Sequence, residues 1–252
     1  MLPTLKNNNF RNNQSMKNFK IVILENPLTT WNLPKTRQIV NEIVSLKSEG
    51  YGRAFNDPLL VIPLDVFEFV GNHILLYKND KLIMGYKNVS YHDCLRMNLD
   101  FPLNGPIRTG GTDEHKKAYH DFFLEHGNKK ISYDCHLTVS NEVASDPELL
   151  YECLSILYAQ VYFYRVENKI DFTFMLGTYF AGTHKTFQKM GAKNFSNLGP
   201  IKLSSYDKRD ALIMLCDQKF TNKTIEFSKK YEILWKMRQI INANVFSSEL
   251  VA

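Results

Sequence analysis

The chain has 252 residues, of which 44% are hydrophobic, 13% aromatic and 23% charged. This composition excludes a disordered chain, a collagen repeat and a coiled-coil array, and it supplies enough apolar material for a sizeable core. No segment approaches the roughly 18 to 20 consecutive apolar residues of a membrane span, and the N-terminus opens on polar residues instead of an apolar signal core. We therefore expect a cytoplasmic protein without integral membrane association.

Cysteine spacing and charge limit the choice further. The four cysteines lie far apart without metal-ligand spacing, so we predict reduced thiols, no disulfide framework and no metal site: Cys94, Cys135, Cys153 and Cys216. The formal net charge of +5 is concentrated near the two ends of the chain. An acidic partner or a phosphate-bearing ligand is one interpretation, and a solvated surface is the other. Nucleic-acid motifs are absent, so we expect no nucleic-acid partner.

In chain order, the first half is predicted to begin with a flexible polar tail over residues 1–18. A strand at 19–24 and a helix follow; the helix rests on Ile39, Val40, Ile43, Val44 and Lys47, which recur at helical spacing, with Gly50 as a stop. Residues 73–91 read as a β-hairpin that turns at Asn79 and Asp80. Residues 94–112 read as a loop, and 115–125 as a short helix.

The second half alternates strands and helices more regularly. The predicted elements are a strand at 130–140, a helix from Asp146 to about Glu167, a strand at 170–176, a helix at 181–190, strands near 194–203 and 211–216, and a last helix at 222–241. Such an order predicts a mixed sheet with helices on its faces. Neither a repeat nor a linker interrupts it, so we expect a single domain over residues 19–252.

This order of elements resembles the GNAT acyltransferase superfamily, and three segments carry the resemblance. Residues 136–140, His-Leu-Thr-Val-Ser, resemble the end of the central strand that precedes the family's acyl-donor loop. Residues 187–192, Phe-Gln-Lys-Met-Gly-Ala, resemble the segment that closes its last core helix. The hairpin at 82–85 is similar to the family's glycine-containing opening strands. Together the three segments span about residues 74–216.

The resemblance implies an α/β (α+β) fold with a mixed, mostly antiparallel central sheet, a splayed parallel strand pair and helices on both faces. The splayed strands would be residues 131–140 and 170–176. Their unpaired backbone groups can bond an extended pantetheine arm as an added strand would. The diphosphate of coenzyme A, if that is the donor, would sit on the N-terminus of the helix that begins near Asp146.

The donor loop departs from the family pattern. Residues 141–148 contain no glycine, and Glu142, Asp146 and Glu148 stand where a polyanion would dock. Phe187 replaces the tyrosine that often protonates the leaving thiolate. These departures resemble the branch of acyl-homoserine-lactone synthases and long-chain N-acyl amino acid synthases, which commonly take acyl chains from acyl carrier protein. A carrier protein is acidic, and a set of basic residues would suit its docking: Lys185, Lys189, Lys193, Lys202, Lys208 and Arg209.

N-acyl transfer requires a neutral amine, a polarised thioester carbonyl and a proton for the leaving thiolate. Asp134, His136 and Thr138 are predicted to alternate onto one face of their strand. Because imidazole titrates near neutral pH, we predict His136 as the base, with Asp134 orienting it. The alternative is a hydrogen-bonded structural histidine. Cys135 is predicted to point to the opposite face, away from His136.

The other roles follow from the resemblance. His184 is the candidate acid, a surface histidine being the alternative, and Tyr133 and Tyr179 are further candidates for that role. Backbone N–H groups near Val139 and Ser140 would stabilise the oxyanion. The implied acyl-donor-binding residues lie at the two strand ends and just beyond them: Leu137, Thr138, Val139, Ser140, Asn141, Leu176, Gly177 and Lys185. No tightly bound cofactor is expected, and the acyl thioester, on acyl carrier protein or coenzyme A, is a cosubstrate.

Two further features have open interpretations. Residues 105–111 are glycine-rich and include Arg108, which fits either a substrate-covering loop or an ordinary connection. Several aromatic side chains could line an acyl tunnel or simply pack in the core: Phe67, Phe69, Phe101, Phe122, Phe123, Tyr162, Phe163 and Phe174.

The leading prediction is an N-acyltransferase that moves a fatty acyl group from an acyl thioester to a small amine such as an amino acid. A short-chain N-acetyltransferase that uses acetyl-coenzyme A is the alternative within enzymes. A GNAT-like protein that binds an acyl group or a partner without turnover is the alternative outside them.

Overall fold

A mixed β-sheet runs through the chain, which the computed structural model describes over residues 18–57, 59–60, 64–204 and 209–243. Nine strands make up this sheet within the described residues: β1 Phe19–Leu24, β2 Asn72–Lys78, β3 Lys81–Ser90, β4 Ile131–Val139, β5 Phe172–Thr178, β6 Lys193–Asn194, β7 Ile201–Leu203, β8 Arg209–Cys216 and β9 Gln239–Ile241.

Helices connect the strands: α2 Pro34–Phe55, α3 Phe67–Val70, α4 Tyr91–Arg96, α5 Asn104–Gly110, α6 Asp113–His126, α7 Asn141–Ser145, α8 Pro147–Asn168, α9 Thr183–Met190 and α10 Asn222–Lys236, with short 3-10 turns at Pro27–Thr30 and Phe195–Asn197. No described helix is both long enough and apolar enough to cross a bilayer.

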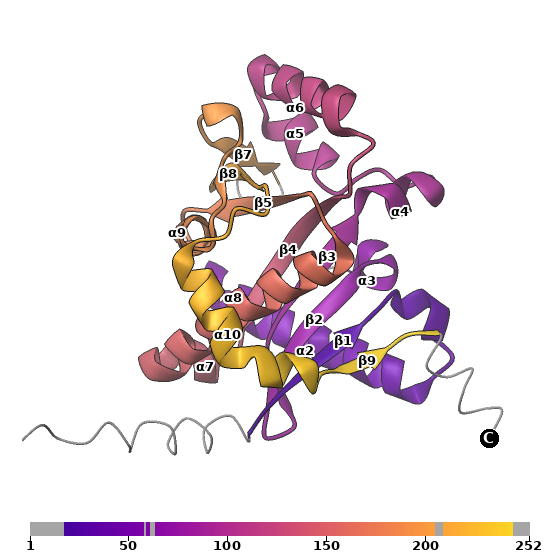
Figure 1. Ribbon diagram of the computed structural model, residues 1–252, viewed down its shortest axis with the longest axis vertical. Helices are drawn as coiled ribbons and strands as arrows, with labels where there is room; N and C mark the ends of the chain where they lie inside the picture. The colour runs from indigo at the N-terminus through magenta and orange to yellow at the C-terminus, as the bar shows by residue number, and fades with distance from the viewer. Residues whose placement is uncertain (1–17, 58, 61–63, 205–208, 244–252) are drawn as a thin grey trace, which may run out of the picture.

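The sheet order is β6-β8-β5-β4-β3-β2-β1-β9, and β7 pairs with β8 beside this path. Two neighbouring pairs are parallel, β4 with β5 and β1 with β9, and the other pairs are antiparallel. The expected mixed, mostly antiparallel sheet is therefore confirmed, with one parallel pair at its centre (Figure 1).

The central parallel pair separates toward its C-terminal end. The last paired residues are Asp134 of β4 and Met175 of β5, and the described backbone beyond them forms no further pairs between the two strands. At the same level β4 bulges, since His136 and Leu137 lie opposite the single residue Tyr86 of β3. His136 itself has a φ of 58°. Bulges bend a strand and redirect its side chains, so the separation has a local cause.

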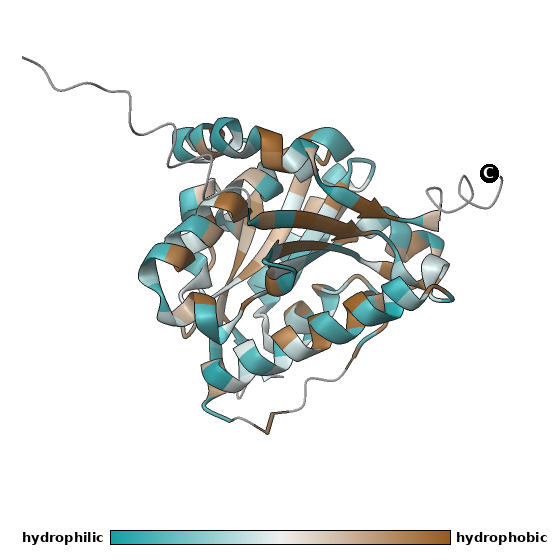
Figure 2. Cartoon of the chain, turned by 90° about the horizontal axis from the view of Figure 1, so that it is seen from below, coloured by the Kyte–Doolittle hydropathy of each residue, from teal (hydrophilic) through white to brown (hydrophobic). Residues whose placement is uncertain are grey.

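Helices cover both faces of the sheet, as expected. The long helix α8 and α10 pack against one face, and α2 with α4, α5 and α6 covers the other (Figure 1). Apolar strands fill the middle and the helices around them carry polar residues (Figure 2). The α2 face holds two separate apolar clusters, one under α2 and one under α4 to α6. Polar residues occupy the space between them.

Local sequence explains the two long helices. Asp146 caps α8 by accepting hydrogen bonds at Oδ1 from the N–H groups of Glu148 at 3.0 Å and Leu149 at 3.1 Å. The predicted stop of α2 at Gly50 is wrong, because the helix continues to Phe55 and ends at Asn56 with a φ of 55°. Gly50 has another role: a Cβ there would lie 2.3 Å from Cγ2 of Thr138, so only glycine lets α2 approach β4 this closely.

Three other expectations are corrected. Residues 94–112 contain the end of α4 and the helix α5, where a loop was predicted. The last helix ends at Lys236, and Gln239–Ile241 instead forms β9, which pairs with the edge strand β1. The strand expected near 194–203 is divided into β6 and β7 by a 3-10 turn. The predicted tail falls almost wholly on residues 1–17, outside the described residues.

Candidate functional site

The bulge in β4 directs consecutive side chains to one face of the sheet. Asp134 bonds Arg165 of α8, whereas His136 bonds Lys47 of α2 on the opposite face. Cys135 also lies near the charges of Lys47 and Lys87 on the α2 face. The predicted alternation of Asp134, His136 and Thr138 is therefore broken, and the expectation that Cys135 and His136 point apart is wrong.

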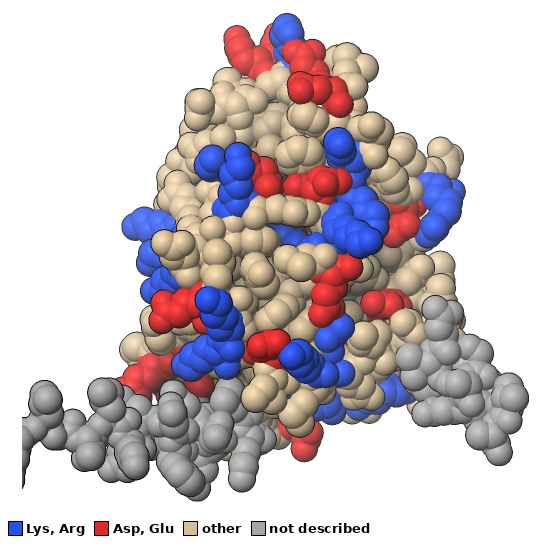
Figure 3. Space-filling model, viewed as in Figure 1, with Lys and Arg blue, Asp and Glu red and all other residues tan. Residues whose placement is uncertain are grey.

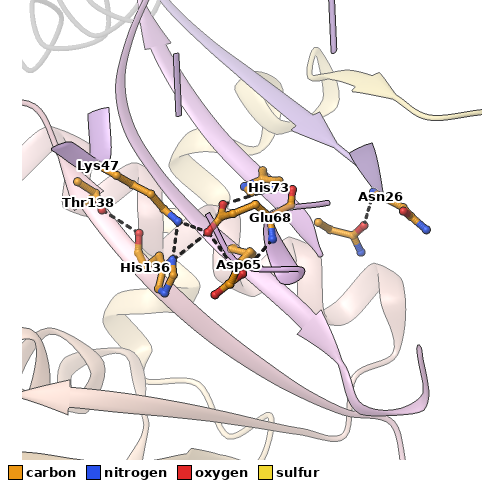
Figure 4. A network of polar contacts seen from close by, with 9 residues as sticks. Asn26, Lys47, Asp65, Glu68, His73, His136 and Thr138 are labelled. Atoms are coloured by element: carbon orange, nitrogen blue, oxygen red, sulfur yellow. Dashed lines mark hydrogen bonds and ion pairs between the residues drawn. The ribbon is translucent and has the colours of Figure 1, made fainter. Parts of the chain in front are cut away.

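His136 belongs to a buried network of charged groups under α2. The ammonium groups of Lys47 and Lys87 both contact Oε1 of Glu68, Lys87 at 2.8 Å. The Nδ1 atom of His136 contacts Lys47 Nζ and lies 3.3 Å from the same carboxylate oxygen. Asp65 adds a second carboxylate 3.2 Å from Lys87. Lys47 and His136 are both directed toward Glu68 (Figure 4); we call Lys47, Glu68, Lys87 and His136 the polar network.

Burying these charges is costly, so the arrangement is informative. Glu68 is 1% exposed, and its Oε2 has no hydrogen-bond partner among the described residues. His73 donates from Nε2 to the Glu68 carbonyl oxygen at 2.9 Å and thereby fixes the backbone of the short helix α3. Burying a charged group costs stability, and buried titratable groups with perturbed pKa values are common at functional sites.

The charges of the network set its protonation. Burial raises the pKa of Glu68, but the contact with His136 and the charges of Lys87 and Lys47 outweigh this, so the net pKa is lowered. Burial, and then the charge of Lys87, lower the pKa of Lys47. Burial also lowers the pKa of His136, and it lowers the pKa of His73 to about 4. Both histidines are consequently neutral at pH 7, beside an ionised Glu68.

Cys135 does not supply a thiolate to this site. Burial raises the pKa of its thiol to about 12 despite the nearby lysines. A neutral, buried thiol is a weak nucleophile. Its closeness to His136 therefore does not make a cysteine–histidine pair of the kind used in covalent catalysis.

The role of His136 depends on which ring nitrogen carries the hydrogen. Its Nδ1 lies against both Lys47 Nζ and Glu68 Oε1. With the hydrogen on Nδ1, the ring donates to Glu68 and Nε2 has the lone pair of a base. With the hydrogen on Nε2, Nδ1 accepts from Lys47 and Nε2 is a hydrogen-bond donor. No described residue is bonded to Nε2.

A row of side chains on α2 continues from the polar network to the protein surface. Lys47, Tyr51 and Phe55 follow each other at four-residue spacing and so lie on one side of the helix. The Tyr51 ring lies edge-on to His136 with 6.3 Å between centroids. The ring of Phe55 contacts that of Phe180, which follows β5, with 5.3 Å between the ring centroids.

Arg209, at the start of β8, completes this surface. Its guanidinium carbon lies 4.6 Å from the ring centroid of Phe55 and 4.7 Å from that of Phe180. We call Tyr51, Phe55, Phe180 and Arg209 the rim cluster. It joins α2, the loop after β5 and β8, and therefore spans the end of the sheet where β4 and β5 separate.

Asp134 does not orient His136. Its carboxylate is buried and accepts hydrogen bonds from Asn88 Nδ2 at 2.6 Å and from Arg165 Nη2 at 3.0 Å. Burial acts to lower the pKa of Arg165, but Cys216 and Asp134 raise it above its usual value. The pair anchors α8 to the sheet. Glu68, which the sequence did not single out, is the carboxylate beside His136.

His184 lies on the other face of the sheet from His136. Its Nδ1–H donates to the Thr178 carbonyl oxygen at 3.1 Å, and its ring contacts that of Tyr179 at 4.6 Å. A Cβ on Gly177 would lie 2.7 Å from the His184 Cα, so glycine allows α9 to lie directly on β5. His184 is thus held beside the end of β5, next to the expected donor-binding residues Leu176 and Gly177, while Lys185 is exposed.

Of the two predicted oxyanion donors, the Ser140 N–H is already bonded. Ser140 N–H donates to Ile83 O at 2.8 Å, and Asn141 N–H donates to the Glu49 carboxylate. Arg53 of α2 bonds the Asn141 side chain and the Val139 carbonyl oxygen, the latter at 3.1 Å. Leu137 and Val139 pack against the α8 side, and Thr138 faces α2. The Val139 N–H therefore stays a predicted donor at this position, with His136 close to it in β4.

An open groove of about 680 Å³ adjoins this turn. It lies between the C-terminal half of α2 and α7, and its lining includes Glu49, Arg53, Asn141 and Ser145. Of the three acids in the donor loop, Glu142 turns to Lys78 and Lys81 of the β2–β3 hairpin, and Asp146 caps α8. The backbone N–H groups at the start of α8, which were predicted to bind a diphosphate, instead donate to the side chain of Asp146.

The remaining candidates have structural roles. Phe101, Phe122, Phe123 and Phe174 pack on each other in the cluster under α4 to α6, whereas Phe163 stacks on Trp235 on the opposite face. Residues 105–110 are helical, and a Cβ on Gly110 would lie 1.9 Å from the Lys202 carbonyl oxygen. Among the described residues, no group of three or more His, Cys, Asp or Glu could hold a metal ion.

Comparison with solved structures places this geometry among known folds. The chain is similar to BjaI, a CoA-dependent acyl-homoserine lactone synthase solved with SAM and isopentyl-CoA, with a TM-score of 0.54 and 11% identity over 92% of this chain and 99% of that one. It is also similar to FeeM, an N-acyl amino acid synthase from uncultured soil microbes, with a TM-score of 0.46 and 13% identity over 79% of this chain and 92% of that one. Neither a protein-family model nor a curated protein matches the sequence. The likeness to BjaI shows that the chain has the GNAT-like fold.

Proposed function

We propose that the chain is an N-acyltransferase that moves a fatty acyl group from an acyl thioester to the amine of a small molecule such as an amino acid. One observation carries this proposal: β4 and β5 stop pairing after Asp134 and Met175, and His136 lies at that point with its Nε2 unbonded within the described residues. The unpaired strand edges can bond the amides of a pantetheine arm. The thioester at the end of that arm then lies next to His136.

The reaction forms a C–N bond and breaks a C–S bond. The neutral amine attacks the thioester carbonyl carbon, the carbonyl oxygen gains negative charge, and the thiolate leaves with the proton that the amine loses. We assign to His136 the stabilisation of that oxygen through its Nε2–H. In this tautomer Lys47 donates to Nδ1, and Glu68 keeps Lys47 charged.

His184 is proposed to act on the leaving sulfur from the opposite face of the sheet. Its Nδ1–H is bonded to Thr178, which orients Nε2 toward other partners. In the neutral form Nε2 accepts a proton, and only the imidazolium form donates one. We therefore propose that His184 takes up at Nε2 the proton that the amine loses and passes it to the thiolate, which returns the ring to its neutral form.

The donor loop favours acyl carrier protein over coenzyme A. Coenzyme A brings a diphosphate, which is commonly bound by free backbone N–H groups at a helix N-terminus. Here Asn141 N–H is bonded to Glu49, and the first N–H groups of α8 are bonded to Asp146. Arg53, beside the groove, is the cation available for a single phosphate.

The positions of exposed lysines determine where an acidic carrier protein can dock. Lys and Arg are interspersed with Asp and Glu on the face shown in Figure 3. Lys185, Lys189 and Lys193 are exposed on α9 and β6, whereas Lys202 pairs with Asp210 at 2.8 Å. We propose that the three exposed lysines contact the acidic carrier; Lys208 lies outside the described residues.

The test measures thioester consumption by the purified full-length chain. Dodecanoyl-acyl carrier protein, dodecanoyl-coenzyme A and acetyl-coenzyme A are each supplied with a mixture of amino acids, and free thiol and acylated products are quantified. We expect the carrier-bound donor to react fastest. Faster consumption of acetyl-coenzyme A would favour the short-chain alternative, and binding of the donors without thiol release would favour the non-catalytic one.

A further inference from the structure

The rim cluster contains a cation without a carboxylate partner among the described residues. The guanidinium carbon of Arg209 lies 4.6 Å from the ring centroid of Phe55 and 4.7 Å from that of Phe180, and the two centroids are 5.3 Å apart. Both rings lie on one side of the guanidinium, where aromatic contact is favourable, and its N–H groups can bond a ligand on the other sides. Arg209 is thereby oriented before any ligand arrives, which reduces the entropy lost on binding.

Asp210, the acid next to Arg209 in the described part of β8, does not neutralise it. Asp210, its neighbour in β8, forms an ion pair with Lys202 of β7. Side chains alternate along β8, so that Ala211 and Ile213 lie in the cluster on the α2 face and Leu212 in the cluster on the α8 face. Arg209 shares the face of Ala211, which is also the face of His136, and Asp210 is directed to the other.

The position of Arg209 relates it to the reacting end of the site. Phe55 links the arginine to Tyr51, with 6.3 Å between the two ring centroids, and the Tyr51 ring contacts His136. The exposed aromatic residues Tyr179 and Phe180 continue this surface at the end of β5. The rim cluster therefore places aromatic rings and the Arg209 cation next to His136 on the α2 face.

We propose that Arg209, held by Phe55 and Phe180, binds the carboxylate of the acceptor, so that the substrates are amines that also carry a carboxylate. This inference rests on the proposed acyltransferase function and specifies its acceptor. A guanidinium fork matches the two oxygens of a carboxylate, and aromatic neighbours reduce the competition from water. The donor phosphate is expected at Arg53, on the other side of the α2 C-terminus.

The test compares the binding of acylated carboxylates with that of their neutral amides. The probes are N-dodecanoylglycine and N-dodecanoyl-γ-aminobutyrate, each with its primary amide, titrated calorimetrically into the full-length chain. The variants are Arg209→Gln, Arg209→Lys and the control Arg96→Gln. Arg96 is a suitable control because it is exposed on α4 and, among the described residues, pairs with Asp93 alone.

We expect the wild type to bind at least one carboxylate about tenfold more tightly than its amide, as a charge-assisted hydrogen bond predicts. Arg209→Gln should bind acid and amide within about twofold of each other, with the amide affinity unchanged, and Arg96→Gln should keep the wild-type preference. Arg209→Lys keeps the charge and loses the planar fork, so the preference should shrink without vanishing. This variant decides the question if circular dichroism shows that Arg209→Gln is unfolded.

Two results would overturn the assignment. Equal binding of acids and amides by the wild type refutes the carboxylate site and leaves the acyltransferase proposal standing, because the acyl amide is still bound. A preference for acids that survives in Arg209→Gln places the carboxylate elsewhere. Failure of the wild type to bind any of the probes contradicts both the carboxylate site and the proposed product class.

Discussion

Replacing Glu68 with glutamine tests whether this carboxylate holds the polar network together. Its Oε1 atom contacts the ammonium groups of both Lys47 and Lys87 in a region where all three side chains are buried. Glutamine has nearly the same shape but no charge, so two positive charges would be left facing a neutral amide. Breaking a buried ion pair by removing one partner costs roughly 3–5 kcal/mol.

The structure places the expected loss near the lower end of that range. Lys87 keeps the carboxylate of Asp65 at 3.2 Å, and that partner is partly exposed. Lys47, whose pKa is already lowered, can lose its proton and relieve the remaining repulsion. We expect Glu68→Gln to lower the free energy of unfolding by about 3 kcal/mol, a large part of the roughly 5–15 kcal/mol that stabilises a typical domain.

The assay is urea unfolding followed by circular dichroism at pH 7. The control is Asp121→Asn, which removes the carboxylate of the exposed pair between Lys117 and Asp121 on α6. A pair of this kind contributes about 0.3–0.5 kcal/mol. A loss in Glu68→Gln of less than about 1 kcal/mol, or one equal to that of the control, would refute the reasoning that Glu68 neutralises two buried lysines.

Three further predictions follow from packing and protonation. Gly50→Ala should lower the free energy of unfolding by about 1–2 kcal/mol, because its Cβ would lie 2.3 Å from a side-chain carbon of β4, whereas Gly105→Ala, with open space around the Cβ, should not; thermal melts of both variants check this. The pKa of His73 is lowered to about 4 by burial, so the unfolded chain binds its proton first and stability should fall as the pH drops from 6.5 toward 4, by up to about 3 kcal/mol. His73→Gln should flatten part of this decline in urea titrations, and an unchanged slope would contradict the assignment. Asp134→Asn should destabilise the protein, because Arg165 loses its carboxylate partner. The pH dependence of acyl transfer should keep its shape in this variant. A shifted pH profile would show that Asp134 takes part in the reaction.

The fold was largely predictable because each long element has a local signal. Asp146 and the following proline mark the start of α8, and the Asn79–Asp80 turn marks the hairpin of β2 and β3. The strand order and the separation of β4 from β5 agree with the resemblance drawn from residues 136–140 and 187–192. The strand β9 escaped prediction because three residues are too few for a pattern, and the pairing with β1 that forms it joins distant parts of the chain.

The site was only partly predictable, because a bulge and two long-range contacts define it. A strict two-residue period puts Asp134 beside His136, but the bulge at His136 moves the two to opposite faces of the sheet. Glu68 meets His136 across a long stretch of sequence, and its own local pattern gives no sign of this. Lys47 offered a signal, since it is the charged residue in the apolar stripe of α2, and so did Lys87, in the middle of a buried strand.

The most direct test of the account is mass spectrometry of lipid extracts from cells that produce the wild type, His136→Gln or the control His120→Gln. His120 is exposed on α6, far in sequence from the bulge, so its replacement should change nothing. We predict new acylated amines with the wild type and with His120→Gln, and their loss with His136→Gln. Acylated amines that persist in a folded His136→Gln variant would contradict the role of His136 at the opening between β4 and β5, and their absence from the wild type would contradict acyl transfer itself.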